Sequence, residues 1–283
     1  YGPAPAEVLT TIYSRVSHIV VGNHDAVFAG KLNSSYFNDS ARLMLDWTQN
    51  ELDDRAREFL GNLPYVLEGQ NFRCVHSQPA SPKEFSYIYD CEEAAAAWNS
   101  CTEQLIFVGH THVPSLFVVG DSGNVHNLPT QDFSLERNKR YIVNVGSVGQ
   151  PRDGDPRATY CIFDTESSSV YYRRVGFDTE AYREEVEKRR IPCPQTYFLE
   201  AAEKSSLPPV RDMVDFKPAD KAESNGDEVT VKRLQQAQRR FKLWKTVGSV
   251  TLLISLFLVV GSISIVMRKN NNALYTIKPL QSA

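Results

Sequence analysis

Two histidines, His110 and His112, stand two positions apart just after the apolar run 105–108. That run is short and ends at Gly109, which is typical of a buried strand. In an extended loop both imidazoles would project to the same side, and two imidazoles directed at one point suit metal ions. Histidine pairs of this spacing also occur in unrelated loops, so the pair needs supporting residues elsewhere.

The same order of residue types occurs twice more in the chain. In each case a short apolar run is followed at once by side chains that can bind a metal or a proton. The run 18–21 is followed by Gly22-Asn23-His24-Asp25, and the run 72–75 is followed by His76. This recurrence predicts that several strands deliver ligand-type side chains to a common site.

The residue types indicate how such a site could work. The amide oxygen of Asn23 and the imidazoles of His76 and His110 could bind one ion, and His112 could reach a neighbouring ion. Mixed oxygen and nitrogen ligands favour Mn, Fe, Zn or Co over Ca. Two metals about 3.5–4 Å apart would supply the nucleophile and the positive charge that hydrolysis of a phosphate ester requires.

His24 stands beside a predicted ligand and could face the substrate instead of the metal. There it could donate to a phosphoryl oxygen or protonate the leaving oxygen. Asp25 could hold that imidazole in the required tautomer. An acid at this position could equally cap a helix or a turn, so two interpretations of Asp25 remain open.

These motifs resemble those of a known family. In this order, Gly22-Asn23-His24-Asp25, Val75-His76 and Gly109-His110-Thr111-His112 resemble the later motifs of the calcineurin-like metallophosphoesterases. The resemblance covers about residues 1–175, includes the segment 146–152, and is strongest to the small bacterial phosphodiesterase branch.

The resemblance implies a two-sheet β-sandwich flanked by helices, with two divalent transition-metal ions (Mn, Fe, Zn or Co) at the strand ends. It implies metal-dependent hydrolysis of phosphodiesters or phosphomonoesters. By motif match, Asn23, His76 and His110 correspond to ligands of one metal and His112 to a ligand of the other. His24 matches the histidine that contacts the scissile phosphate.

The sequence departs from the family at its start. The family also has an Asp-x-His motif and a Gly-Asp motif, whose aspartate bridges the two metals, and neither precedes Gly22-Asn23-His24-Asp25 in this sequence. The opening residues resemble those that follow the Gly-Asp motif, so we expect that the chain starts just after it. The alternative to a membrane-anchored phosphoesterase is then a non-catalytic, membrane-tethered binding module with an incomplete metal site. For the enzyme, the expected substrates are a phosphorylated small molecule, a nucleotide or a phosphoprotein.

The elements that must position these residues follow from the hydrophobic pattern. Helices and strands alternate first and hairpins follow, which predicts a mixed α/β (α+β) domain over residues 1–200 with helices outside two sheets. Helices are expected over 6–16, 40–49, 53–60, 92–98 and 179–190, strands over 18–21, 66–76, 105–108 and 141–145, and hairpins over 116–128 and 159–175.

Some polar and aromatic residues have a structural interpretation beside a functional one. Arg152 could reach a substrate phosphate, although a turn that links two strands accounts for the loop 151–157 more simply. Tyr87 and Tyr89 could line a pocket, but aromatic residues two apart are more often one face of a strand. His126, in a predicted hairpin, is expected to be structural.

Global composition narrows the class of protein. The net charge of −3 gives no indication of specific nucleic-acid binding. Five cysteines without a CxxC pair favour a reducing compartment over a disulfide framework.

The last third of the chain changes in composition. Residues 201–228 have the composition of a linker, and residues 229–246 are basic. Residues 247–267 carry no charge and, at about 1.5 Å per residue, would span roughly 31 Å as a helix. A single transmembrane helix is therefore expected there, followed by the tail 268–283. More basic residues precede the run than follow it, which predicts a cytoplasmic N-terminal domain.

Overall fold

The computed structural model describes residues 2–192, residue 199, residues 250–257 and residues 262–269. Its helices are α1 Pro5–Arg15, α2 Asn23–Phe28, η1 Ser34–Tyr36, α3 Asp39–Glu51, α4 Asp54–Gly61, α5 Cys91–Asn99 and α6 Thr179–Lys188. Its strands are β1 His18–Val20, β2 Val66–Gly69, β3 Phe72–Val75, β4 Leu105–Val108, β5 Ser115–Val119, β6 Val125–Leu128, β7 Phe133–Ser134, β8 Arg140–Asn144, β9 Ala158–Asp164, β10 Ser169–Val175, β11 Val250–Phe257 and β12 Ser262–Lys269.

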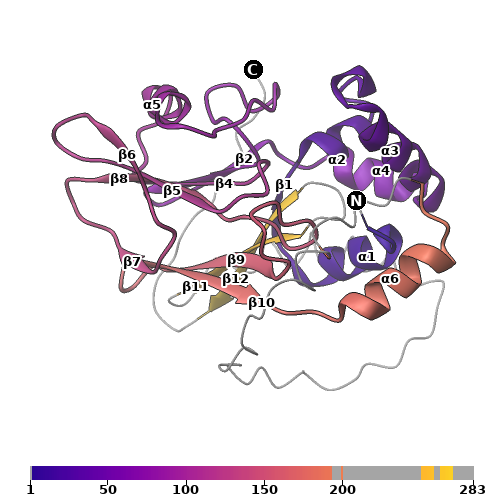
Figure 1. Ribbon diagram of the computed structural model, residues 1–283. Helices are drawn as coiled ribbons and strands as arrows, with labels where there is room; N and C mark the ends of the chain where they lie inside the picture. Colours follow the sequence, from indigo (N-terminus) through magenta and orange to yellow (C-terminus); the bar gives the residue numbers. More distant parts are fainter. Residues whose placement is uncertain (1, 193–198, 200–249, 258–261, 270–283) are drawn as a thin grey trace.

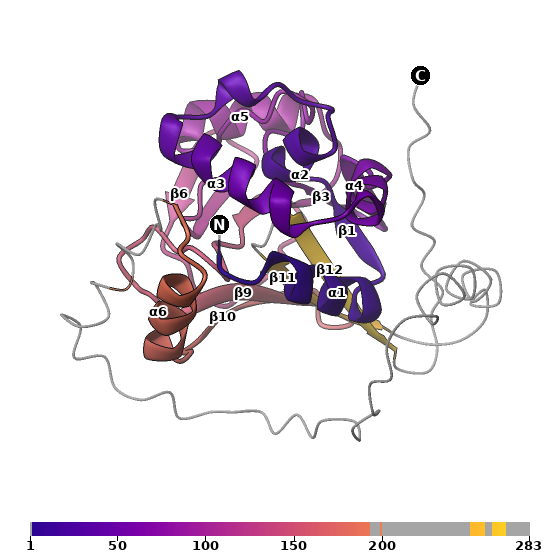
Figure 2. The same ribbon diagram turned by 90° about the vertical axis from the view of Figure 1, so that its right-hand side faces the viewer.

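Two six-stranded sheets form the centre of the molecule (Figure 1). One has the order β1-β12-β11-β9-β10-β7 and the other the order β2-β3-β4-β8-β5-β6. In the second sheet β3, β4 and β8 run parallel, so their carboxyl ends meet at one edge. Helix α5 lies outside the second sheet and helices α1 to α4 gather at one end (Figures 1 and 2). The predicted two-sheet architecture with flanking helices is confirmed.

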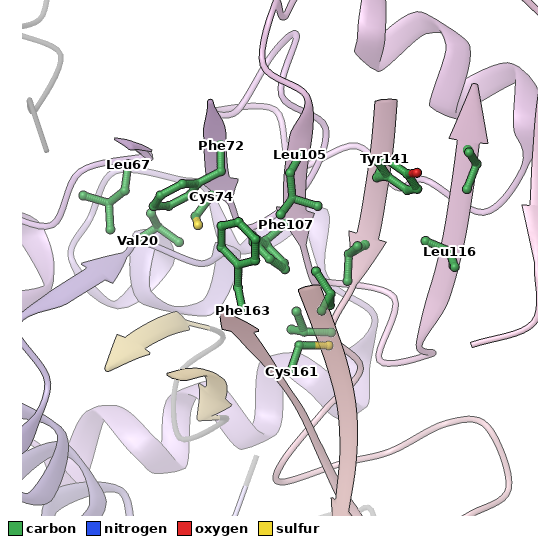
Figure 3. Close-up of a cluster of buried hydrophobic side chains, with 14 residues drawn as sticks. Val20, Leu67, Phe72, Cys74, Leu105, Phe107, Leu116, Tyr141, Cys161 and Phe163 are labelled. Atoms are coloured by element: carbon green, nitrogen blue, oxygen red, sulfur yellow. The ribbon is translucent and has the colours of Figure 1, made fainter. Parts of the chain in front are cut away.

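The core between the sheets explains the uninterrupted apolar run of β4. Leu105 and Phe107 belong to the cluster that fills the space between the two sheets, where the Phe107 ring lies 5.8 Å from that of Phe163 in β9 (Figure 3). Ile106 and Val108 alternate with them and pack in the cluster beneath α5. Both faces of β4 are therefore buried, as expected for a central strand of a parallel segment.

The helices at the end of the sandwich share a smaller core. Its buried members come from all four helices and are Leu9, Val27, Phe28, Leu45, Ala56 and Leu60. Asn38 begins α3 by accepting a hydrogen bond from Ala41 N (2.9 Å), and Asp53 begins α4 by accepting one from Ala56 N (2.9 Å). The five predicted helices correspond to α1, α3, α4, α5 and α6, and the two predicted hairpins to β5–β6 and β9–β10.

The structure does not support the predicted transmembrane helix over residues 247–267. Residues 250–257 and 262–269 form the antiparallel strands β11 and β12, which lie between β1 and β9 in the first sheet. The run is rich in β-branched residues and is divided by Gly261, so its apolar character suits a strand pair as well as a helix. No helix within the described ranges is long and apolar enough to cross a membrane.

The predicted linker 201–228 and the basic segment 229–246 lie outside the described residues. The same holds for the predicted tail, apart from Arg268 and Lys269 at the end of β12.

Candidate metal centre

Three of the predicted metal ligands meet at the strand ends. Asn23 follows β1 and begins α2, while His76 follows β3 and His110 lies two residues after β4. The parallel pairing of β3 with β4 continues to the site, because Gly109 N donates to the carbonyl oxygen of His76 (3.0 Å). The Nε2 atom of His76 lies 3.1 Å from Asn23 Oδ1 and 3.1 Å from His110 Nδ1. Side chains from three separate parts of the sequence thus converge on one point.

These separations fit a shared metal ion. Octahedral coordination with bonds of about 2.1 Å places neighbouring ligand atoms roughly 3.0 Å apart. The other ring nitrogen of His76, Nδ1, is buried and makes no hydrogen bond to any described residue. The polar partners of this ring among the described residues are therefore all at Nε2, and a cation bound there would place the proton on Nδ1.

The cluster of Asn23, His76 and His110 contains only two side chains of the types His, Cys, Asp and Glu. Across the described ranges, no group of three or more His, Cys, Asp and Glu side chains is arranged to hold a metal ion. The convergent set of Asn23, His76 and His110 has an amide as its third member, and amide oxygen is a weaker ligand than carboxylate for a divalent cation.

His112 is oriented by the loop that follows β8. Its Nδ1 atom donates to the carbonyl oxygen of Gln150 (2.8 Å), and its own carbonyl accepts a hydrogen bond from Arg152 N (3.1 Å). A metal-binding histidine commonly donates its second ring N–H to a carbonyl in this way, which leaves Nε2 as the ligand atom. The geometry of His112 therefore suits its predicted role at a neighbouring ion.

The backbone of the histidine loop is not extended. His110 has φ 67° and His112 has φ 64°, both in the left-handed region that non-glycine residues rarely adopt. The expectation of two side chains on one side of an extended loop is therefore wrong, although both rings are buried at the site. Such strained conformations persist where surrounding contacts hold them, which occurs mainly at functional sites.

Asn144 is the residue that holds this loop, and the sequence analysis did not identify it. Its side chain is fully buried and donates to the carbonyl of Gly109 (2.7 Å) and to Oγ1 of Thr111 (2.9 Å). Its Oδ1 atom accepts a hydrogen bond from Gly146 N (3.0 Å). A signal was present, because Asn144 is a polar residue at the end of an apolar strand, as Asn23 is.

His24 and Asp25 occupy the first turn of α2. The ring of His24 is buried, with its centroid 4.5 Å from that of Phe37. Asp25 is fully buried, and its Oδ2 atom accepts a hydrogen bond from Gly22 N (2.8 Å). Asp25 therefore serves as the capping acid of α2, and its predicted effect on the tautomer of His24 stays a prediction.

The histidines are held in their neutral form. Burial lowers the pKa of His24 and His76 well below the usual 6.5. Burial, opposed in part by a hydrogen bond to the backbone of Phe85, lowers the pKa of His110 to about 4. Burial and then the charge of Arg152 lower the pKa of His112 to about 3. Neutral imidazole is the form that binds a metal, so the site is ready to do so at pH 7.

Acid is therefore expected to destabilise the metal-free protein. Below about pH 6.5 the unfolded chain binds protons at His110 and His112 that the folded chain does not, so the free energy of unfolding falls as the pH falls toward 4. Each histidine contributes up to about 1.4 kcal/mol per pH unit. Urea unfolding in a chelator between pH 7 and pH 4.5 measures this slope. A His112→Gln variant should show a shallower slope, and an unchanged slope would contradict the role assigned to burial.

Aromatic side chains border the site. Tyr87 stacks on His110 with ring centroids 4.0 Å apart and planes 9° apart, and Tyr89 stacks on Tyr87 at 5.0 Å and 19°. Both tyrosines lie in an irregular segment before α5, so the interpretation as one face of a strand is wrong. The exposed Arg152 donates to Oε1 of Gln150 (3.0 Å), and its positive charge acts on His24, His110 and His112.

The fold and the site together define a class of protein. A two-sheet sandwich with Asn and His side chains at the ends of its strands is the arrangement that the sequence motifs imply for a metal-dependent phosphoesterase. Comparison with known proteins supports the same class.

Residues 4–168, more than half of the chain, match the calcineurin-like phosphoesterase superfamily domain. The crystal structure of a metallophosphoesterase from Sphaerobacter thermophilus is similar, with 32% sequence identity and a TM-score of 0.58 over 71% of this chain and 83% of that chain. An uncharacterized protein of Methanocaldococcus jannaschii is 34% identical over 197 residues, which are 68% of this chain and 78% of the relative. The chain therefore belongs to the calcineurin-like phosphoesterase superfamily. This family in general hydrolyses phosphoesters and uses a dinuclear site of divalent metals.

Proposed function

We propose that this protein hydrolyses phosphodiesters or phosphomonoesters and depends on divalent transition metals. The observation that carries the proposal is the convergence of Asn23 Oδ1, His76 Nε2 and His110 Nδ1 at the ends of β1, β3 and β4. In this proposal those three atoms hold one ion, and His112 contributes to a second. Mn, Fe, Zn and Co fit this ligand set best.

When bound, the metal ions would supply Lewis acidity and lower the pKa of a water molecule. The residues of the chain add orientation and charge. Because burial lowers the pKa of His24, its ring is neutral at pH 7 and suits donation of a hydrogen bond to a phosphoryl oxygen more than transfer of a proton. Arg152, exposed at the rim and charged, can pair with a phosphate oxygen.

The direct test is hydrolysis of bis(p-nitrophenyl) phosphate by the full chain with Mn²⁺, Co²⁺, Zn²⁺ or Mg²⁺, with p-nitrophenyl phosphate as the monoester comparison. We expect turnover with a transition metal and complete loss in EDTA, and the two rates show whether the diester or the monoester is the better substrate. Absence of turnover with every metal, while calorimetry still detects metal binding, would overturn the enzymatic proposal.

Absence of turnover would support the alternative function, a non-catalytic, membrane-tethered binding module with an incomplete metal site. The observation that favours this alternative is that the described residues supply no set of three or more His, Cys, Asp and Glu side chains for a metal. A module of this kind would bind phosphate compounds at Arg152 without hydrolysing them.

The location of the protein in the cell stays a prediction. The uncharged residues 247–267 and the preceding basic segment support attachment to a membrane, with the phosphoesterase domain in the cytoplasm. The pairing of β11 and β12 with β1 and β9 is the competing arrangement of the same residues. Sedimentation of the full chain with membranes after an alkaline carbonate wash distinguishes the two.

A further inference from the structure

The aromatic pair Tyr87 and Tyr89 is unusual because it is exposed and yet stacked on a site residue. Tyr87 contacts both His110 and Tyr89 with nearly parallel planes, so it lies between them. The two tyrosines are 40% and 57% exposed, which places both in contact with solvent. Large apolar surfaces exposed beside a polar site commonly mark a place where a ligand binds.

The backbone that carries the tyrosines is fixed on both sides. Ile88, between them, is buried in the cluster beneath α5. Before the pair, the carbonyl of Ser86 accepts a hydrogen bond from Gln78 N (3.1 Å). After it, Asp90 caps α5 by accepting hydrogen bonds from Glu92 N and Glu93 N (both 2.9 Å). The rings are therefore displayed by a preorganised segment, which reduces the entropy lost when a ligand binds.

A positive charge accompanies the aromatic surface. Arg152 lies next to the histidine loop, because its backbone N–H donates to the carbonyl oxygen of His112 (3.1 Å). Burial and Tyr87 raise the pKa of Tyr89 and the charge of Arg152 lowers it, which agrees with this position. An exposed guanidinium and exposed aromatic rings at the same site can together bind a ligand with an anionic group and a planar group.

The order of the stack gives the spacing of such a ligand. Tyr87 lies next to His110, with ring centroids 4.0 Å apart, and Tyr89 lies beyond Tyr87, with ring centroids 5.0 Å apart. A ligand ring on the outer face of Tyr89 would be two tyrosine layers away from His110, which suits a planar group separated from the phosphate by a spacer more than one bonded to it directly.

We propose that the outer face of Tyr89, whose inner face packs on Tyr87, stacks with the base of a small nucleotide phosphoester while Arg152 pairs with its phosphate. The inference rests on the proposed hydrolysis at the metal centre and specifies its substrate class. Among the expected substrates, it favours nucleotides over phosphoproteins and over phosphoesters that lack a planar group. Stacking tolerates different bases, because every base has a π-face.

The first test compares two chromogenic diesters in the full chain with Mn²⁺. One is the p-nitrophenyl ester of thymidine 5′-monophosphate, which carries a base beyond a sugar, and the other is bis(p-nitrophenyl) phosphate. We expect Tyr89→Ala to reduce the ratio of kcat/KM for the nucleotide ester to kcat/KM for the aryl ester about tenfold, mainly through KM. Tyr89→Phe, which keeps the ring, should retain the ratio.

The matched control is Phe177→Ala. Phe177 is also an aromatic residue, 39% exposed, that contacts a second ring, that of Tyr182. It lies two residues before α6, and α6 is on the side of the molecule opposite α5 (Figures 1 and 2). This variant should leave both the ratio and the basal activity unchanged. An unchanged ratio in Tyr89→Ala would overturn the inference and leave the proposed hydrolysis standing.

A second measurement does not depend on catalysis. Calorimetric titration of the metal-free chain in a chelator compares adenosine 5′-monophosphate with ribose 5-phosphate, which has the same sugar phosphate without the base. We expect the nucleotide to bind about tenfold more tightly, and Tyr89→Ala to abolish that difference. Equal affinities in the unmodified chain would overturn the inference. A base-dependent difference without any turnover would instead support it and contradict the proposed hydrolysis.

Discussion

Replacing His76 with alanine is expected to reduce kcat/KM for a phosphodiester by roughly 1,000-fold or more, because a metal ion contributes several kcal/mol to transition-state stabilisation. His76 is the central ligand of the candidate site, since its Nε2 atom faces both Asn23 Oδ1 and His110 Nδ1 at 3.1 Å. Its loss should also weaken metal binding, which calorimetric titration with Mn²⁺ measures independently of turnover.

The matched control for this substitution is His126→Ala. His126 is exposed on β6 and lies outside the convergent set, so its replacement should leave kcat/KM and metal affinity within twofold. Circular dichroism and thermal unfolding should show that both variants are folded. If His76→Ala retained both metal affinity and turnover, the assignment of the metal centre to the ends of β1, β3 and β4 would be wrong.

Replacing Phe107 with alanine is expected to lower the free energy of unfolding by about 3–5 kcal/mol. The ring of Phe107 is fully buried between the two sheets and packs against Phe163 of the opposite sheet (Figure 3). Alanine would leave a cavity that the strands on either side cannot fill without moving. Urea unfolding at neutral pH measures the loss.

Leu128→Ala provides the comparison, because Leu128 lies in β6 of the same sheet and is 42% exposed. We expect it to change the free energy of unfolding by no more than about 0.5 kcal/mol. A similar small change for Phe107→Ala would show that the space between the sheets is less tightly packed than the structure indicates.

Much of the site could be predicted because ligand-type residues directly follow apolar strands. The runs before Asn23, His76 and His110 correspond to β1, β3 and β4, and the three side chains converge. The parallel register of β3 and β4 then aligns their ends. The positions of the strands and of the polar residues that follow them are visible in short stretches of sequence, which is why the sequence alone could indicate the site.

The features that the sequence did not reveal depend on contacts between distant residues. Helix α2 is too short for a periodic pattern, and no local signal requires a left-handed backbone at His110. That backbone is held by Asn144, 34 positions away in the chain. The stacking of Tyr87 on His110 is likewise a tertiary contact. In residues 247–267 the local pattern itself fits two structures. An apolar run has the same hydropathy whether it forms a helix or pairs as strands.

The position of the candidate ligands has a consequence for the two sheets. Asn23 follows a strand of the first sheet, whereas His76 and His110 follow strands of the second. An ion held by all three would act as a cross-link between the layers, and its binding free energy would add to that of folding. The coupling is reciprocal, so a substitution in the core that loosens the layers would also weaken metal binding. Phe107, which never touches the ion in this arrangement, would then help to determine how tightly the protein retains it.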